Sequence, residues 1–531
     1  MAKLLTAKGY AIEKASLKPE EVLLIKSELT VSPKVMAKFN KVDKSFPIFL
    51  ESRSRYYLPR AWAEEHFGPA GEDRMSPGLP LPASLTFKGS PYPYQEEIIG
   101  KFCGQAKNGL ICVPCGRGKT FMALAIAFKL GKRFLIIVDK EFLMNQWKGE
   151  IESLIPGIRI GILQADKQQY KTEVITSKAA TISEMKILAK EAGLKVGGTK
   201  DELFARLKEA NIDLTPKTET IEYDCTICMI QTICLHDFPV GAFDAYGFTI
   251  FDECHHLGAQ HFSDALRKIQ TPRMLGLSAT PKRDDGLTKV FEYYLGPPIY
   301  EEKTREPDPT VKVKAIWFQS KDPAYTNLPV DWRGELVTAR LMTQVVECKA
   351  RTDMVLEHLK ELASDARRKI LVLSERRGHL ETIDKGLPTA LVRGYYVGGM
   401  KQADLDRNAE TCQILLATYA MASEAMNIKA LNAMIMASPR KKVEQSTGRI
   451  LRVTADKRVV EPLIVDVVDQ HDTYVRQWQL RARYYRKCAY AIEHVNRPKS
   501  VKDEAEEGKE SKPKNEVVTE EKCMITLSLP I

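Results

Sequence analysis

The run Val113-Pro-Cys-Gly-Arg-Gly-Lys-Thr120 stands between an apolar stretch and a helical stretch, and its residue types suit phosphate chemistry. Gly116 and Gly118 accept positive φ, which lets several backbone N–H groups point toward one anion. Lys119 would place its cation on the β- and γ-phosphates of a nucleotide, and the Thr120 hydroxyl would bind Mg²⁺. The sequence therefore predicts a site for ATP and Mg²⁺. An ordinary glycine-rich turn is the alternative.

A second group of candidate residues, Asp252-Glu-Cys-His-His256, follows the apolar run at 248–251. A carboxylate at the end of a strand can hold Mg²⁺ against Thr120, and the next carboxylate can deprotonate an attacking water. We assign the first role to Asp252 and the second to Glu253, with a pair of surface acids as the alternative. His255 is interpreted as a coupling residue and not as a zinc ligand, because adjacent side chains at a strand end point to different sides.

Short apolar runs that alternate with helical patterns must position these residues. Such runs are typical of buried parallel strands in α/β proteins. They form two series, at 110–113, 134–138, 225–230, 248–251 and 274–277, and at 370–373, 390–392, 414–417, 433–436 and 463–467. We therefore predict two α/β parallel-sheet lobes in tandem, over 81–305 and 336–497, joined by a Pro-containing linker over 306–335.

Three further segments lie outside these two series. Residues 1–80 form an N-terminal accessory domain that closes in a run rich in Pro and Gly. Residues 171–222 interrupt the first series, show no strand pattern, and carry helical spacings at 182–191 and 201–210, which predicts a small helical insert. The tail at 498–531 is rich in Lys, Glu and Ser, so we expect it to be disordered.

Composition excludes several classes of protein. The 531 residues are 44% hydrophobic and contain 11 scattered Cys, with no signal peptide and no apolar run long enough to span a membrane. We therefore expect an intracellular, soluble protein without a membrane partner.

Net charge is +10, and residues 1–497 alone carry 73 basic against 61 acidic side chains. This excess is compatible with a groove that follows nucleic-acid phosphates, but solvated surface would also explain it.

An ordered set of motifs in this chain resembles those of the superfamily 2 helicases and translocases. The resemblance is closest to the XPB-like branch with its relatives in phages and large DNA viruses, including the poxvirus helicase of transcript release, so a viral protein is expected. It covers residues 85–495. The motifs are Tyr94-Gln95, Val113 to Thr120, Leu143-Met-Asn-Gln-Trp147, Gln231-Thr232, Asp252 to His255, Ser278-Ala-Thr280, Val397-Gly-Gly-Met400, the run 417–424 and the run 445–452.

This resemblance implies two RecA-like lobes and assigns further roles. Gln95 would read adenine, Arg117 would belong to the nucleotide loop, and Ser278, Thr280 and Gln445 would couple the two activities. The contacts with nucleic acid would come from Gln231, Thr232, Gly398, Gly399 and Thr418. Two positions depart from the family pattern: Val113 replaces a glycine, and Ala425-Met-Asn-Ile428 replaces Gly-Leu-Asp-Ile.

Arg449 and Arg452 are the candidate arginine fingers. They are three residues apart, so on a helix they would share one face. A planar guanidinium can stabilise the charge that develops on a transferring phosphoryl group, which is worth roughly 10³–10⁵ in rate. A basic helix surface is the alternative.

Two other segments carry candidate contacts with DNA. The insert at 181–210 resembles a SAP-like motif, which implies binding of duplex DNA by Lys195, Lys200 and Arg206; a structural helical hairpin is the alternative. The late helical stretch at 476–487 carries Arg481 among other arginines and either extends the DNA track or docks with its arginines at the surface.

The sequence thus predicts an ATP- and Mg²⁺-dependent DNA helicase or translocase that acts independently of base sequence, in transcription, replication or repair. We expect a monomer in the host cytoplasm or nucleus or in the virion, with RNA as a further substrate and the transcription machinery as a partner. Two alternatives stay open: a double-stranded DNA translocase that does not separate strands, and an ATP-binding scaffold with an inactive motor.

Overall fold

The structure, a computed structural model, divides into two compact units whose main boundary falls between Glu306 and Pro307. It describes residues 3–33, 45–104, 108–114, 116–171, 173–176, 181–210, 212, 218–279, 282–283, 285–302, 307–424, 428, 430–448, 450 and 457–498. Thr280, Arg449, Arg452, most of the motif at 425–428 and nearly all of the tail lie outside these residues. Among the described residues, no helix combines the length and the hydropathy that crossing a membrane requires.

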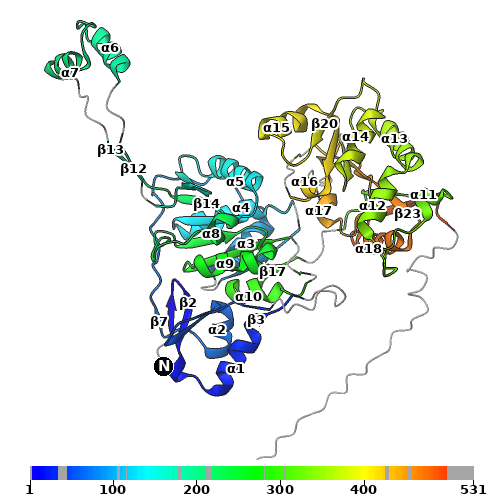
Figure 1. The fold of residues 1–531 in the computed structure, drawn as a ribbon, viewed down its shortest axis with the longest axis horizontal. Helices are drawn as coiled ribbons and strands as arrows, with labels where there is room; N and C mark the ends of the chain where they lie inside the picture. Colours follow the sequence, from blue (N-terminus) through cyan, green and yellow to red (C-terminus); the bar gives the residue numbers. More distant parts are fainter. Residues whose placement is uncertain are drawn as a thin grey trace, which may run out of the picture. The chain divides into compact units, whose positions relative to one another are not determined.

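The first unit is built on an eight-stranded sheet in the order β11-β10-β14-β9-β15-β16-β8-β17 (Figure 1). Every neighbouring pair is parallel except β10 and β11. Its central strands are continuous apolar runs because both of their faces are covered. The strands are β8 (Gly109–Cys112), β9 (Phe134–Val138), β10 (Ile160–Gln164), β11 (Lys167–Gln168), β14 (Cys225–Met229), β15 (Phe248–Phe251), β16 (Arg273–Ser278) and β17 (Pro298–Glu301).

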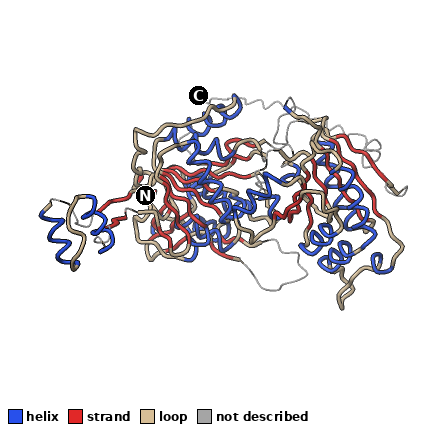
Figure 2. Tube along the Cα trace, turned by 90° about the horizontal axis from the view of Figure 1, so that it is seen from above, coloured by secondary structure: helices blue, strands red, loops and turns tan. Residues whose placement is uncertain are grey.

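The helices of this lobe connect successive strands, and Figure 2 shows them flanking the strands of the sheet. α4 packs against β15, and α5 packs against β14 and β9. The helices are α3 (Pro93–Gly104), α4 (Lys119–Leu130), α5 (Glu141–Leu154), α8 (Ile230–Leu235), the 3₁₀ helix η2 (Cys254–Gly258), α9 (Gln260–Lys268) and α10 (Thr288–Leu295).

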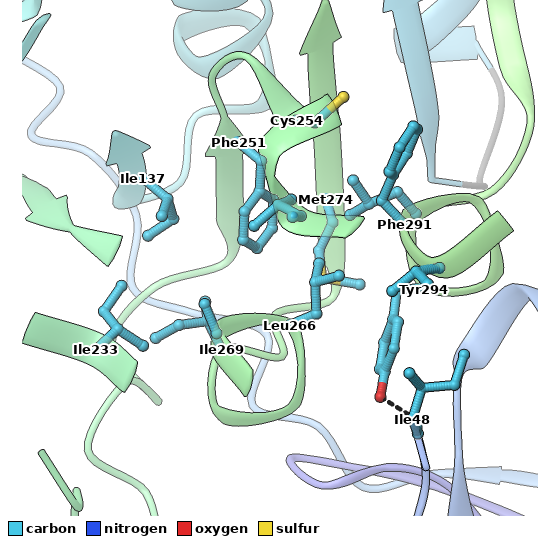
Figure 3. Packing of buried hydrophobic residues seen from close by; sticks show 14 of the residues in the cluster. Ile48, Ile137, Ile233, Phe251, Cys254, Leu266, Ile269, Met274, Phe291 and Tyr294 are labelled. Atoms are coloured by element: carbon cyan, nitrogen blue, oxygen red, sulfur yellow. Dashed lines mark hydrogen bonds between the residues drawn. The ribbon is translucent and has the colours of Figure 1, made fainter. Parts of the chain in front are cut away.

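The N-terminal domain shares a hydrophobic core with this lobe. Trp62 and Ile25 belong to the same buried cluster as Phe251 and Phe291, and the Tyr294 hydroxyl donates to the Ile48 carbonyl (Figure 3). The Pro- and Gly-rich run that closes this domain also docks on the lobe, since the Leu79 N–H donates to the Ala245 carbonyl. The elements are β1 (Leu4–Thr6), β2 (Gly9–Glu13), η1 (Lys14–Ser16), α1 (Pro19–Glu28), β3 (Thr30–Val31), β4 (Phe46–Pro47), β5 (Leu50–Glu51), β6 (Arg55–Leu58), α2 (Arg60–Phe67) and β7 (Glu72–Asp73).

The insert is a helical hairpin that begins and ends in a pair of strands. α6 (Ile182–Glu191) and α7 (Lys200–Glu209) match the expected helices, and each starts with a capping box, at Thr181 and Thr199. The absence of strands was predicted wrongly, because β12 (Glu173–Thr176) and β13 (Thr218–Ile221) form an antiparallel pair. This pairing brings the two ends of the insert together, as its position between β11 and β14 required.

The second unit contains a fully parallel sheet in the order β20-β21-β19-β22-β23-β18-β24. Two of its strands were not predicted: β18 lies within the range expected as a linker, and β24 follows the last helix. A strand expected at 390–392 begins instead at Arg393. The strands are β18 (Lys312–Phe318), β19 (Ile370–Ser374), β20 (Arg393–Tyr396), β21 (Ile414–Thr418), β22 (Ala433–Met436), β23 (Leu463–Asp469) and β24 (Ala491–Val495).

The last helix of this unit docks on the sheet and does not present all its arginines to solvent. Trp478 and Arg481 are both 2% exposed, and the Arg481 guanidinium pairs with Asp466 at 2.8 Å. This corrects the DNA-track interpretation for Arg481. The helices of this unit are α11 (Pro323–Thr326), α12 (Thr338–Glu347), α13 (Lys349–Ala363), α14 (Arg377–Lys385), α15 (Gln402–Thr411) and α18 (Asp472–Lys487). Two further helices follow strands of its sheet along the chain, α16 (Tyr419–Glu424) after β21 and α17 (Glu444–Thr447) after β22, and the division into units groups residues 421–429 and 444–452 with the first unit.

Candidate nucleotide-binding and nucleic-acid-binding sites

The predicted nucleotide residues gather at one edge of the first sheet. β15, β16 and β8 are neighbouring parallel strands, so their carboxyl ends lie at the same edge. Asp252 follows β15, Ser278 ends β16, and Val113 follows β8. The Val113 N–H donates to the Ser278 carbonyl at 3.2 Å, which joins the start of the glycine loop to β16.

The glycine loop has the conformation that a phosphate cradle requires. Gly116 and Gly118 have φ of 87° and 76°, and Gly118 is the residue before the first turn of α4. The Lys119 ammonium lies 3.5 Å from the Val113 carbonyl and 4.0 Å from Glu253 Oε1. Several N–H groups and one cation thus face the loop at the positive end of a helix.

Gln95 is hydrogen-bonded to the backbone of this loop. Its Oε1 accepts from the Tyr92 N–H at 3.0 Å, and its Nε2 donates to the Arg117 carbonyl at 3.2 Å. A Cβ on Gly118 would lie 2.5 Å from that Nε2, so any larger residue there would displace the Gln95 amide. Gln95 therefore fixes the backbone of the loop, and its predicted reading of adenine stays a prediction.

Arg117 points away from the cradle and joins it to the end of the lobe. Its guanidinium pairs with both carboxylate oxygens of Glu302, the nearest contact being 2.8 Å, and lies 4.7 Å from the centre of the Tyr94 ring. The Tyr94 hydroxyl also donates to the Arg117 carbonyl at 3.1 Å. The Arg117 side chain is thus committed to the protein, and its backbone is what faces the cradle.

The pKa values of the two carboxyl groups after β15 are shifted in opposite directions. Desolvation, and then the charge of Glu253, raise the pKa of Asp252 to about 6, although Trp147 Nε1 donates to its Oδ2 at 2.7 Å. Desolvation acts upward on Glu253 as well, but the Lys119 ammonium and His255 outweigh it and lower its pKa to about 2. Glu253 is therefore the more acidic of the two carboxyl groups.

The backbone conformation of Glu253 and the burial of its carboxylate suit a role in catalysis. Its φ of 42° is in the left-handed region, a strained conformation for a residue other than glycine. Its Oε2 is buried and makes no hydrogen bond to any residue that the structure describes, while His255 Nδ1 lies 3.4 Å from it. A buried, ionised acceptor of this kind suits the removal of a proton from water.

His255 links this carboxylate to the neighbouring strand. Its Nδ1 lies 3.1 Å from the Ser278 hydroxyl at the end of β16. The predicted coupling residues His255 and Ser278 are therefore in contact. Thr280 is outside the described residues, and for Gln445 only the backbone, in α17, is described.

These residues fit ATP and Mg²⁺. Asp252 is a desolvated carboxylate whose raised pKa shows that a nearby cation would stabilise its charge, and Thr120 stands in the first turn of α4 beside Lys119. Asp252 and Thr120 would hold the metal, and the loop from Gly116 to Lys119 would hold the phosphates. When bound, the ion would supply positive charge to the phosphate oxygens.

The predicted nucleic-acid residues of the second unit also share one edge. β20 and β21 are neighbouring parallel strands, with Tyr396 opposite Ala417, so Gly398, Gly399 and Thr418 lie beyond adjacent strand ends. The Arg377 guanidinium donates to the Gly398 carbonyl and fixes this loop. Arg377 was not predicted, because no local pattern connects it to the glycines.

In the first unit, the predicted contacts Gln231 and Thr232 bond within the protein. Thr232 is 5% exposed, and its hydroxyl accepts from the Ala165 N–H at 2.9 Å, which corrects the prediction that this hydroxyl faces nucleic acid. Gln231 Nε2 donates to the Asp139 carbonyl at 2.8 Å. Both side chains thus shape loops at the sheet edge.

In the insert, Lys195 and Lys200 are exposed, but Arg206 is structural. Its guanidinium donates to the Lys195 and Gly197 carbonyls, which closes the loop between α6 and α7. The apolar contacts of Met185, Leu203 and Leu207 form the small core. Lys195 and Lys200 are therefore the side chains left to bind a phosphate.

Two partners in the nucleotide site were missed by sequence reasoning. Trp147 lies in the motif quoted at 143–147, but nothing in its pattern indicates the hydrogen bond to Asp252, which is 105 residues away. Glu302 stands 185 residues from Arg117, in a segment with no motif. The sequence around Glu302 indicates only that β17 ends in acidic residues.

A matched pair of glycine substitutions would test the fixed loop. Gly118→Ala and Gly131→Ala both place alanine in the left-handed region, at the two ends of α4, at a cost of about 1–2 kcal/mol. Only Gly118→Ala meets Gln95, because nothing lies within 4 Å of a Cβ on Gly131. We expect ATP affinity to fall on the order of tenfold or more for Gly118→Ala alone. Titration with a fluorescent ATP analogue, beside thermal unfolding, gives both quantities; equal affinities would contradict the role of Gln95.

Comparisons with known proteins agree with this geometry. The family described as "Type III restriction enzyme, res subunit" matches residues 88–283. A protein of Acanthamoeba polyphaga mimivirus, named as an ATP-dependent RNA helicase, is 28% identical over 94% of this chain and 88% of its own length. An African swine fever virus protein, also named as an ATP-dependent RNA helicase, is 26% identical over 76% of this chain and 74% of its own.

A third relative is the XPB helicase/translocase subunit of the general transcription and DNA repair factor IIH of Schizosaccharomyces pombe. It is 26% identical over 43% of this chain and 24% of its own length. The ordered motifs, the two parallel-sheet lobes and these relatives agree with one another. The chain is thus similar to ATP-dependent helicases of superfamily 2, among them viral helicases and XPB.

Proposed function

We propose that this helicase uses ATP hydrolysis to move along DNA independently of base sequence. The observation that carries the proposal is the group of Lys119, Asp252 and Glu253 at one sheet edge, where Glu253 is an ionised carboxylate beside the cation of Lys119. A scaffold with an inactive motor would have no need of this electrostatic arrangement.

Glu253 is the proposed general base. Its lowered pKa keeps it ionised at neutral pH, and the hydrogen-bond capacity of Oε2 is available to an attacking water. Lys119 would bind the phosphates, and Asp252 with Thr120 would hold Mg²⁺. Arg449 and Arg452 stay the proposed arginine fingers, and both are outside the described residues.

DNA is the proposed substrate, with RNA as the contrasting outcome. The viral relatives are named as RNA helicases, whereas the relative from Schizosaccharomyces pombe is named for transcription and DNA repair. The SAP-like hairpin, with Lys195 and Lys200 exposed beside the loop that Arg206 closes, favours duplex DNA. Gly398, Gly399 and Thr418 are proposed contacts with the backbone of the strand. We also propose that the protein works as a monomer in viral transcription.

ATPase assays with different nucleic acids test this function. We expect turnover to rise several-fold with duplex DNA, and less with single-stranded RNA or an RNA–DNA hybrid. Stimulation by RNA alone would replace the DNA assignment, and no stimulation by any nucleic acid would reject the motor. Strand displacement on forked, 3′-tailed and 5′-tailed duplexes then separates a helicase from a translocase that leaves the strands paired.

Glu253→Gln tests the assignment of the base. An amide cannot accept a proton from water, so hydrolysis should fall by about 10²–10⁴-fold, the usual contribution of a general base. ATP binding should persist because Lys119 and Asp252 are unchanged. Steady-state turnover and nucleotide titration are the measurements, with Glu141→Gln at an exposed position of α5 as the control. Near-normal turnover in Glu253→Gln would show that another group is the base.

The insert is tested by a lysine pair. The double variant Lys195→Ala with Lys200→Ala should weaken duplex binding. Binding should also depend less on salt, because a protein with fewer phosphate contacts releases fewer counterions from the DNA. Arg206 is kept because it closes the hairpin loop. Lys186→Ala with Lys190→Ala removes the same charge from exposed positions of α6 and should have a smaller effect. Titration of labelled duplex at two salt concentrations gives affinity and slope; equal results for both pairs would leave a structural insert.

A further inference from the structure

The backbone segment 437–440 of the second unit is held by two buried ion pairs. It connects β22 to the residues before α17 and so leads along the chain toward the predicted arginine fingers. Two arginines, Arg351 of α13 and Arg481 of α18, each donate one hydrogen bond to a carbonyl of this segment. We call this arrangement the 437–440 clamp.

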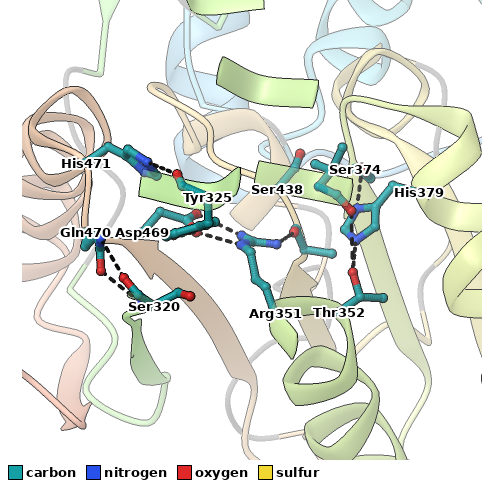
Figure 4. Close-up of polar contacts among 12 residues, drawn as sticks. Ser320, Tyr325, Arg351, Thr352, Ser374, His379, Ser438, Asp469, Gln470 and His471 are labelled. Carbon is teal, nitrogen blue, oxygen red and sulfur yellow. Dashed lines mark hydrogen bonds and ion pairs between the residues drawn. The ribbon is translucent and has the colours of Figure 1, made fainter. Parts of the chain in front are cut away.

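Figure 4 shows the first half of the clamp, in which Arg351 meets Asp469. Arg351 and Asp469 have side chains with 0% exposure, and the guanidinium meets the carboxylate twice, at 2.6 and 2.9 Å. The remaining Arg351 Nη1 donates to the Ala437 carbonyl at 2.6 Å. Tyr325 donates to Asp469 at 2.7 Å, and its pKa is raised by burial and by that carboxylate, so the phenol stays a donor.

The second half repeats this chemistry from another helix. Arg481 meets Asp466 of β23 twice, both contacts at 2.8 Å, and its Nη1 donates to the Arg440 carbonyl. Tyr485 donates to Asp466 at 2.9 Å. Each guanidinium thus uses its planar set of donors to join one carboxylate and one carbonyl, which an ammonium cannot do.

The same segment touches the neighbours of the proposed nucleic-acid contacts. The Ser438 carbonyl accepts from the Tyr419 hydroxyl at 2.7 Å, and the Ser438 hydroxyl accepts from the Glu375 N–H at 2.8 Å. Arg440 pairs with Glu375 at 3.0 Å and lies over the Tyr419 ring. Tyr419 directly follows Thr418, so a shift of that strand end reaches the clamped segment.

Stability alone does not explain where these pairs are placed. A buried ion pair is often no more stabilising than apolar residues of the same size, and its geometry is specific. A third group of the same kind, Arg393 with Asp384 and Tyr395, lies elsewhere in this lobe. Its guanidinium donates to the Pro388 and Leu391 carbonyls, away from 437–440. This third group has the same residue types and hydrogen bonds as the clamp but does not hold the 437–440 segment.

We propose that Arg351 and Arg481 are positioning residues that couple nucleic-acid binding to ATP hydrolysis. Movement at the strand ends near Thr418 would be passed through the rigid segment 437–440 to the chain that carries Arg449 and Arg452. The inference rests on the proposed function, in which those arginines act in hydrolysis. It assigns a role to two residues that touch neither substrate.

The test compares Arg351→Lys, Arg481→Lys and Arg393→Lys in the full chain. Lysine keeps the positive charge beside each aspartate but loses the second set of hydrogen bonds. We expect the stimulation of ATPase by nucleic acid to fall about tenfold in the two clamp variants, the factor that one hydrogen bond to a charged group can contribute. The KM for ATP and the turnover without nucleic acid should stay unchanged. Arg393→Lys should leave the stimulation unchanged, because its guanidinium donates to the Pro388 and Leu391 carbonyls and not to the 437–440 segment.

Amide hydrogen exchange over residues 433–448 supplies a readout independent of activity. Exchange should be faster in Arg351→Lys and Arg481→Lys than in wild type, and unaltered in Arg393→Lys. Unaltered exchange in the clamp variants would overturn the proposal. So would an equal loss of stimulation in Arg393→Lys, since that would be a general effect of stability. If the wild type is not stimulated by nucleic acid, the proposed function fails, and the coupling role fails with it even where exchange shows that the segment is clamped.

Discussion

Two adjacent carboxylates at the end of β15 are the electrostatic constraint on which the first lobe depends. Side by side and desolvated, Asp252 and Glu253 cannot both ionise without compensation. Lys119 stabilises the charge of Glu253, and Trp147 donates to Asp252, while His255 connects the pair to β16. The parallel sheet is what allows this, because it brings three strand ends and one helix start to a single edge.

The same edge explains why the glycine loop and Gln95 form one unit. The loop can turn its N–H groups inward only with positive φ at two glycines, and Gln95 then fills the space that a side chain at Gly118 would need. Arg117 extends the unit to Glu302, at the last described position of the lobe before residue 307. A shift of the loop backbone would therefore alter the contacts of Arg117 with Tyr94 and with Glu302, which follows β17.

Sequence patterns predicted the parts of this structure that depend on local information. Strands such as β9 and β15 are continuous apolar runs, because both faces of a parallel sheet are buried, and the nucleotide loop is contiguous in sequence. β18 escaped prediction because Lys312 and Lys314 interrupt its apolar pattern. Thr232 and Arg206 were predicted to contact nucleic acid, yet each bonds to protein. The helix that carries Arg481 was left open between a DNA track and a docking helix, and Arg481 bonds to protein as well. A sequence pattern does not show partners that lie far away along the chain.

The second lobe shows what a buried arginine can do that a surface arginine cannot. Arg351 and Arg481 each combine with an aspartate and a tyrosine, and each still has a donor left for a main-chain carbonyl. A carboxylate alone would satisfy the charge, so the carbonyl is the part of the contact that fixes geometry. Two such contacts on four consecutive residues remove the rotational freedom that one would leave. Breaking either buried pair would leave a charge without its partner inside the protein, so the two arginines hold both ends of the segment in place.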